Sequence, residues 1–218
     1  IKPERTTELE FGADFSVMGG LATVEATLYQ QSIEDLILLV DEAPSSGASN
    51  SWQNGGEMET NGLELALGLN PTSLIDLGGL DWNMHMTYYT NESEVTKLTV
   101  DPYNYGGFAT FLGTYRIEEG WSPTAIVGAD YDADENHIEL GNENPDFRLS
   151  FRNSLSFGPL SLSFLIDHKE GGHAINLANL IYDLGATTAD YEENGSRTAV
   201  LGGGSTAPYV ESTTYTAV

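Results

Sequence analysis

The residues of this chain that could do chemistry are carboxylates set close together. Asp130, Asp132 and Asp134 alternate with other residues, as the ligands of a calcium-binding loop do. The glycine that such a loop needs is missing, and Gly141 stands where its bidentate glutamate belongs. A surface hairpin turning at 134–136 explains the same residues. We therefore predict no dedicated metal site, and the three aspartates remain candidates only for loose association with calcium.

Neighbouring acids also occur at 118–119 and at 190–193, where their types match the two carboxyl groups of a glycosidase. An acid–base pair needs two environments that push the two pKa values apart, and adjacent acids in polar loops lack them. The chain has no nucleophile elbow, zinc-protease helix or phosphate-binding loop, and its four histidines lack ligand spacing. We predict that the protein is not an enzyme and uses no cofactor.

Composition removes further classes of function. Lysine and arginine total 8 against 33 acids, a net charge of −25, and binding to nucleic acid needs clustered cations. The chain has no cysteine, which excludes disulfide scaffolds and cysteine-built zinc sites and is compatible with an outer-membrane protein. No apolar run approaches the roughly 18 residues of a spanning helix. Any membrane span must therefore be made of β-strands.

Apolar and polar residues alternate strictly along several stretches of this chain. In the first, Leu9, Phe11 and Phe15 alternate with Glu10 and Asp14. Such a period of two predicts strands with one apolar and one polar face, which is typical of a transmembrane β-barrel wall. The predicted fold is all-β, an antiparallel up-and-down meander forming part of such a barrel. The predicted strands are 7–17, 21–33, 57–69, 80–90, 147–157 and 160–170.

The connections between these strands alternate in length. Turns at 18–20, 70–79 and 158–159 are short, whereas the connections 34–56, 91–146 and 171–209 are long and rich in Gly, Ser, Asn and acids. A meander places every second connection on the same rim, and in outer-membrane barrels the long ones are extracellular. We expect the acidic part of the second long connection to be solvated. One short helix is predicted within 173–185, where apolar residues fall on one face.

The polar row of each strand would face the lumen of such a barrel. We expect Arg148 and Arg152 to pair with acids on the next strand, such as Asp167, and to line a path or hold a plug. The polar residues predicted to face the lumen are Glu10, Asp14, Glu25, Glu64, Asp81, His85, Arg148, Arg152 and Asp167.

Aromatic side chains in the long connections are the candidates for substrate binding. Sugar rings stack on aromatic faces while their hydroxyls reach nearby carboxylates or amides. The alternative is that these aromatics pack the loops together or form the aromatic girdle of a membrane interface. The candidate residues are Trp52, Tyr103, Tyr105, Trp121, Tyr131 and Tyr182.

Four motifs in order carry a family resemblance. They are KPERTTELEFG at 2–12, NGGEMETNGLEL at 54–65, LGNENPDF at 140–147 and SLSFLIDHKEGG at 161–172. Together they resemble the late barrel strands of SusC/RagA-type TonB-dependent outer-membrane transporters of Bacteroidetes. The chain is accordingly interpreted as a partial TonB-dependent receptor β-barrel domain over 1–218, without the plug domain and the C-terminal strands.

The resemblance implies an importer of glycans or oligopeptides in the outer membrane. It also implies a SusD/RagB-like lipoprotein that closes over the extracellular rim, with 91–146 and 171–209 as its natural contact surface. A TonB–ExbB–ExbD complex would supply work through the plug. These partners, the membrane lipid and the cargo are expectations that come from the family.

Two other functions fit the alternation alone. A soluble or surface-anchored β-sandwich that binds carbohydrate would bury its apolar rows against a second sheet. An adhesin or receptor barrel without cargo would share the wall but not the transport. A barrel and a sandwich differ in what their apolar rows contact. In a barrel these rows contact lipid, and in a sandwich they contact a dry interior.

Overall fold

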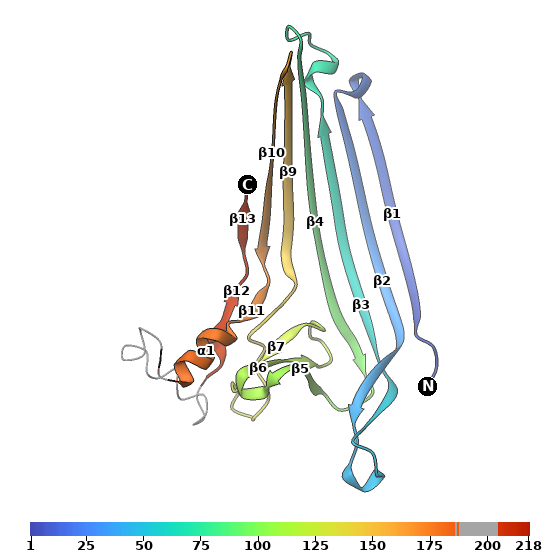
Figure 1. The fold of residues 1–218 in the computed structure, drawn as a ribbon. Helices are drawn as coiled ribbons and strands as arrows, with labels where there is room; N and C mark the ends of the chain where they lie inside the picture. The colour runs from blue at the N-terminus through green and yellow to red at the C-terminus, as the bar shows by residue number, and fades with distance from the viewer. Residues whose placement is uncertain (186, 188–204) are drawn as a thin grey trace.

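The computed structural model describes residues 1–185, 187 and 205–218 of the chain. Its main element is one antiparallel sheet of seven strands in the order β1-β2-β3-β4-β9-β10-β13 (Figure 1). This sheet, the wall, is therefore the meander that the alternation predicted. Its strands are β1 (Arg5–Val17), β2 (Ala22–Asp41), β3 (Asn50–Leu69), β4 (Leu80–Leu98), β9 (Pro145–Phe157), β10 (Leu160–Gly171) and β13 (Tyr215–Ala217).

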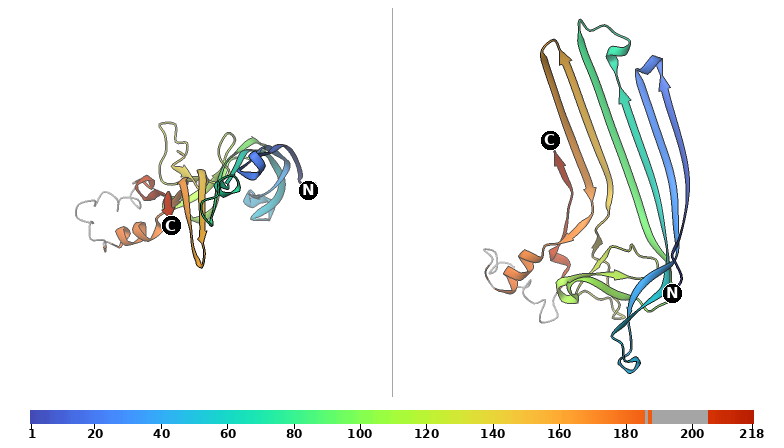
Figure 2. Two further views of the ribbon diagram at one scale, coloured as in Figure 1. Left: turned by 90° about the horizontal axis from the view of Figure 1, so that it is seen from above. Right: turned by 45° about the vertical axis from the view of Figure 1, so that its right-hand side comes forward.

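The short and long connections lie at opposite ends of the wall. The 3-10 turns Met18–Gly20 and Pro71–Ser73 and the turn at 158–159 lie at one end, and the long connections lie at the other (Figure 1). The right view in Figure 2 shows a long wall with the smaller elements gathered at one end. The long connections thus share one rim, as predicted.

Register across the wall keeps the two faces separate. One register row is apolar in six consecutive strands, and the next row along is mostly polar, because successive residues of a strand point to opposite faces. The apolar row is Phe15, Val24, Leu67, Met86, Phe151 and Ile166. The neighbouring row is Asp14, Glu25, Ala66, Thr87, Ser150 and Asp167.

The apolar face of the wall is open. Phe11 is 68 % exposed, Phe15 62 %, Leu160 72 % and Leu162 61 %. In the part of the chain that the structure describes, no second sheet covers these side chains. The dry interior that a β-sandwich requires is therefore not present.

Strands β2, β3 and β4 extend farther toward the long connections than the sequence pattern indicates. A bulge interrupts the β2–β3 ladder between Ile33 and Leu36, where Asp35 has a positive φ of 57°, and pairing then resumes as far as Asp41 and Asn50. The bulge shifts the phase of the alternation, so a period-two pattern appears to end there. For this reason the prediction that 34–56 is a long loop is wrong. Most of it forms a hairpin extension, residues 36–55.

The second long connection also differs from the prediction. Instead of a long loop, it forms a four-stranded sheet of β5 (Tyr103–Ala109), β6 (Gly113–Ile117), β7 (Ala125–Val127) and β8 (Gly141–Asn142). Most acids of this connection are nevertheless exposed, among them Asp132, Asp134 and Glu135, as expected. Strand β7 is almost fully buried, with 0–1 % exposure. Its three apolar residues are too few to stand out as a strand among the surrounding acids.

The third long connection packs against the second. It contains β11 (His173–Ile175), helix α1 (Leu177–Leu184), the 3-10 turn Ala207–Tyr209 and β12 (Val210–Ser212). Leu180 and Tyr209 are buried and contact Leu112 of the second connection. Helix α1 is the short helix that the sequence predicted. The acids at 190–193 lie outside the described residues.

We call these packed elements of the two connections, 103–142, 173–184 and 205–212, the rim cap. Among the residues that the structure describes, no helix has the length and apolar character needed to cross a membrane.

Candidate functional site

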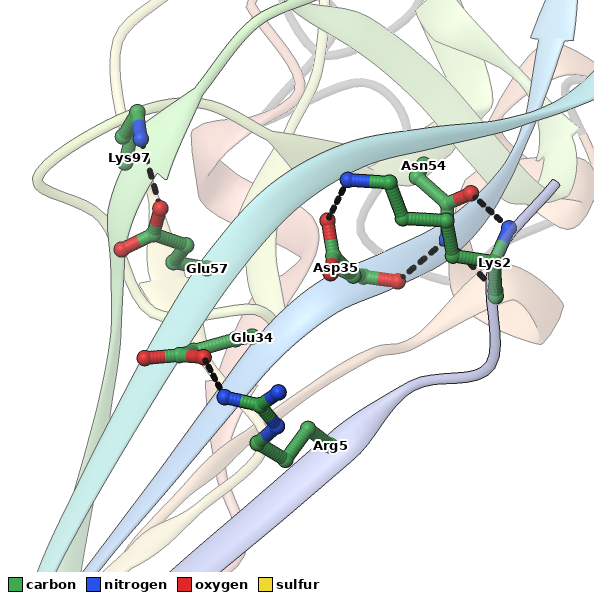
Figure 3. Close-up of polar contacts among 7 residues, drawn as sticks. All are labelled: Lys2, Arg5, Glu34, Asp35, Asn54, Glu57 and Lys97. Carbon is green, nitrogen blue, oxygen red and sulfur yellow. Dashed lines mark hydrogen bonds and ion pairs between the residues drawn. The ribbon is translucent and has the colours of Figure 1, made fainter.

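The hairpin extension is held in place by the segment that precedes β1. The side chain of Asn54 accepts a hydrogen bond from the backbone N–H of Lys2 and donates to the carbonyls of Lys2 and Asp35, at 2.9 and 2.7 Å (Figure 3). One amide thus joins the first residues of the chain, the bulge of β2 and strand β3. The bulge is thereby fixed at the point where the extension begins.

Three ion pairs surround this amide. Lys2 lies 3.9 Å from Asp35, Arg5 lies 3.5 Å from Glu34, and Lys97 lies 2.6 Å from Glu57 (Figure 3). All six side chains are at least 40 % exposed. Exposed pairs of this kind contribute about 0–1 kcal/mol each, so the Asn54 hydrogen bonds do more to define the bulge.

A hollow of about 560 Å³ lies between the hairpin extension and strand β5. We call it the edge hollow. It brings together two of the predicted aromatics, Tyr103 and Tyr105. Its other lining residues are Ile37, Leu38, Leu39, Asp41, Asn50, Asn104, Gly106 and Ile117.

Tyr105, which lines the edge hollow, and its neighbour Tyr115 are anchored by their hydroxyl groups. Tyr105 donates to the carbonyl of Pro123 at 2.6 Å, and its ring centroid lies 5.5 Å from that of Tyr115. Tyr115 donates to the Glu143 carboxylate at 3.0 Å. Burial raises the pKa of Tyr103, Tyr105 and Tyr115, so all three remain neutral hydrogen-bond donors at physiological pH. The aromatic side of the hollow is therefore preorganised.

A second hollow, of about 450 Å³, is lined by acids and amides. We call it the acidic hollow. Burial raises the pKa of Glu139 in its wall, although a hydrogen bond from Asn142 opposes this effect. Carboxylates and amides of this kind can accept hydrogen bonds from hydroxyl or ammonium groups. Its polar lining includes Asn91, Glu92, Ser93, Glu94, Glu139, Asn142, Asn144 and Asp146.

The other four predicted aromatics do not meet at one site. Trp52 of β3 is 56 % exposed and pairs in register with Leu39, which lines the edge hollow. The carbonyl of Trp121 accepts a hydrogen bond from Val95 at 2.9 Å. The rings of Tyr131 and His137 lie 4.7 Å apart. Tyr182 is exposed on helix α1.

Asp130 joins the two halves of the rim cap. Its carboxylate accepts hydrogen bonds from the side chain of Ser205 and from the backbone N–H groups of Thr206 and Ala207, the latter at 2.7 and 3.1 Å. Thr206 is fully buried, and its hydroxyl donates to the carbonyl of Phe111. The first of the three spaced aspartates is therefore used in packing.

The second of these aspartates closes a turn. Asp132 accepts hydrogen bonds from the backbone N–H groups of Asp134 and Asn136 at 2.8 and 2.9 Å, and the bonds from Asn136 lower its pKa. Tyr131 and His137 pair on either side, so the segment is a hairpin. Within the described ranges, no group of three or more His, Cys, Asp or Glu residues could hold a metal ion.

All nine residues predicted to face a lumen lie on the polar face of the wall. The register places Arg148 opposite Lys169 and Arg152 opposite Leu165. Over the described residues, neither arginine forms an ion pair within 4 Å, and Asp167 instead accepts a hydrogen bond from the hydroxyl of Tyr215 at 2.6 Å. The expected pairing of these arginines with Asp167 is therefore wrong.

Several residues of the edge hollow were not predicted from the sequence as site residues. Ile117 lies in strand β6, which the alternation did not reveal. The run Leu36–Val40 is the longest apolar stretch of the chain and is strand-sized. It was the available signal that the first long connection contains an ordered apolar surface.

Comparison with known proteins relates the wall to one family. Residues 1–164 match the family model described as TonB dependent receptor-like, beta-barrel. The comparison with curated proteins gives no match.

Solved structures share the fold. "Structure of the RagAB peptide transporter" matches with a TM-score of 0.66 and 18 % identity, covering 83 % of this chain and 22 % of that one. The RagAB peptide importer matches in its 'closed-closed' state with a TM-score of 0.60 and 18 % identity, over 79 % and 22 %. In its 'open-open' state the values are 0.57 and 19 %, over 78 % and 21 %. The chain thus spans about a fifth of the length of these proteins.

We predict that Asp130→Ala loosens the rim cap, whereas Asp134→Ala does not. The first change removes a charged acceptor from two backbone N–H groups and costs about 2 kcal/mol of local stability. Hydrogen exchange at 205–209 should become faster in the first variant and stay unchanged in the second, with or without calcium. Equal exchange in the two variants, or protection that depends on calcium, contradicts the packing role.

We predict that Glu139→Gln stabilises the rim cap at pH 7 but not below about pH 4. Because burial raises the carboxyl pKa, ionisation disfavours the folded state, and stability falls as pH rises from the ordinary value through the raised one. Thermal unfolding at both pH values measures the effect. Glu135→Gln, at the exposed tip of the hairpin, is the matched control. An equal gain at both pH values would show that charge is not the cause.

Proposed function

Because the chain belongs to the TonB dependent receptor-like β-barrel family, we propose that it forms part of the wall of a TonB-dependent importer in the outer membrane. The observation that carries this proposal is the apolar register row, which runs across six strands. Phe15 and Val24 of this row are exposed, and its other four residues are half-buried. Exposed apolar area costs about 25 cal/mol per Å² in water, and contact with lipid removes that cost. The family is one of receptors and transporters, so no bond chemistry is proposed.

The length of the strands supports a wall that rises above the membrane. A tilted transmembrane strand needs about 9–11 residues. Strands β2 and β3 have 20 residues each and β4 has 19. About half of each strand is then available beyond the bilayer, at the rim that carries the hairpin extension and the rim cap. We propose that this rim is extracellular.

The polar face of the wall is proposed to line the lumen. It carries the nine residues Glu10, Asp14, Glu25, Glu64, Asp81, His85, Arg148, Arg152 and Asp167. Residues 1–218 then form a partial barrel domain of a longer protein. In that protein a plug domain would fill the lumen and connect to a TonB–ExbB–ExbD complex.

Glycans or oligopeptides are the proposed cargo, and a SusD/RagB-like lipoprotein is the proposed lid. The two hollows at the rim support capture at this end of the wall, one with aromatic and aliphatic walls and one with acids and amides. The RagAB proteins that share the fold are described as a peptide transporter. Exposed rim aromatics such as Trp52, Tyr131 and Tyr182 are proposed as outer contacts for cargo or lid.

We predict that Leu65→Arg destabilises the wall in a bilayer and that Ala66→Arg does not. Leu65 lies on the apolar face as the fifth residue from the end of β3, near the middle of a ten-residue span. Arginine at this depth costs about 2–4 kcal/mol, whereas the neighbouring residue faces the proposed water-filled lumen. Unfolding from lipid vesicles by denaturant measures both variants. Equal destabilisation would argue against a lipid-facing row.

Transport itself is tested in cells that produce the full-length protein. Uptake of fluorescent glycans or oligopeptides should depend on both this protein and TonB, and it should be lost when either gene is deleted. A deletion of the lid lipoprotein should lower the uptake. Uptake that persists without TonB, or no uptake of any cargo, would overturn the importer function.

A further inference from the structure

Charge is divided across the polar face of the wall. The cations Arg148, Arg152 and Lys169 lie on β9 and β10, with Asp167 among them. The chain as a whole carries a net charge of −25, so this part of the face is an exception. An anion that reaches the polar face is therefore attracted to β9 and β10. The acids of the face lie mainly on β1, β2 and β3, and they are Glu8, Glu10, Asp14, Glu25 and Glu64.

The three cations have no acid partner on the wall. Over the described residues, none of them lies within 4 Å of a carboxylate. Arg148 stands opposite Lys169 in the β9–β10 ladder, and like charges in that position repel. The Nε atom of Arg148 is also buried without a hydrogen-bond partner. The cations that do form ion pairs are Lys2, Arg5, Lys97 and Arg116.

A pocket lined by Arg152 brings further hydrogen-bond donors together. This lumen pocket has a volume of about 440 Å³ and lies at the end of the wall that carries the short turns. His85 stands opposite Arg152 in the register, and Gly68, the next residue of that row, has no side chain to fill the space. A guanidinium forms paired hydrogen bonds with a carboxylate, and hydroxyl, amide and imidazole groups can donate more. Other polar residues of the lining are Thr23, Asn83 and Ser154.

The acids of the wall nearest to the lumen pocket already have partners. Asp81 accepts hydrogen bonds from the hydroxyl of Thr72 and the amide of Asn83, at 3.4 and 2.9 Å. Asp167 accepts a hydrogen bond from the hydroxyl of Tyr215 at 2.6 Å. A carboxylate for the Arg152 guanidinium therefore has to come from outside these strands.

We propose that the lumen pocket binds a carboxylate group, held by Arg152 with further donors from His85 and Ser154. This inference rests on the proposed importer function, in which the polar face lines a lumen. Two sources carry the same chemistry there. An acidic residue of a plug domain would occupy the pocket in the resting protein, and an acidic residue of a peptide cargo would occupy it only during passage.

The experiment uses the full-length protein in detergent with the substitution Arg152→Lys, which keeps the positive charge and introduces an amine. A carbodiimide joins an amine to a carboxylate in contact with it, and mass spectrometry of the digested protein identifies the two residues. We expect a new crosslink from this lysine. A partner in the plug domain, without added peptide, assigns the pocket to the resting protein.

The second source is tested by adding the peptide acetyl-SGSEGSG-amide, whose glutamate is its one carboxylate. A crosslink from the new lysine to this glutamate assigns the pocket to cargo, and it should be lost when glutamine replaces the glutamate of the peptide. No crosslink to either source overturns the site. A crosslink only to an acid of the wall, such as Asp81, overturns it as well.

A matched control tests the pocket against diffuse charge attraction. Ser161→Lys places the same amine on the polar face of β10, outside the lumen pocket. We expect this lysine to give no crosslink to the carboxylate that reaches the first one. Equal crosslinking of the two lysines overturns the pocket as the site.

A measurement on the unmutated protein covers a variant that fails to fold. Phenylglyoxal modifies accessible arginines, and Arg152 is exposed on the wall. We expect Arg152 to be protected in the full-length protein, at rest or with the acidic peptide, relative to Arg5, whose side chain is 76 % exposed. Equal modification of the two arginines in both states overturns the site.

The site and the importer function fail separately. TonB-dependent uptake by a protein whose Arg152→Lys variant gives no crosslink refutes the carboxylate site alone. A crosslink from the lumen pocket in a protein that imports nothing refutes the importer function alone.

Discussion

The structure depends on an antiparallel register that stays in phase across six strands. A slip of one residue would exchange the apolar and polar faces, so the register must be kept wherever the two faces meet different surroundings. The interruptions in the wall lie near Ile33–Leu36, Glu57/Met58 and Glu170/Gly171, all toward the long connections. The strand segments next to the short turns are uninterrupted, and these are the segments proposed to cross the membrane.

Beyond the bulges, the same strands serve a different purpose. The Asn54 amide fixes the turn of backbone at Asp35, and the hairpin extension then leaves the plane of the wall's regular ladder. The rim cap has its own buried residues, including Ile126, Leu180 and Tyr209. The described residues of the long connections are thus packed on one another, and a packed surface lowers the entropy cost of any binding to it.

An ordered rim explains why the acids there need not form a metal or catalytic site. Asp130 and Asp132 use their carboxylates to accept backbone hydrogen bonds, and Glu118 is bonded to Arg116. The remaining acids give the rim a strong negative charge. The rim therefore differs from the wall in its strong negative charge and in the two hollows that it carries.

The sequence by itself determined the strands of the wall, their two faces, the rim shared by the long connections and the family, because these depend on a local period and on contiguous motifs. Only the tertiary structure decided which residues contact one another at the rim. Asp130 meets Thr206 from 76 residues away, and Tyr103 meets Leu39 only because a bulge continues a ladder that alternation ends at Ile33. Contacts between distant residues leave no periodic trace in the chain, so the two hollows had to be seen in the fold.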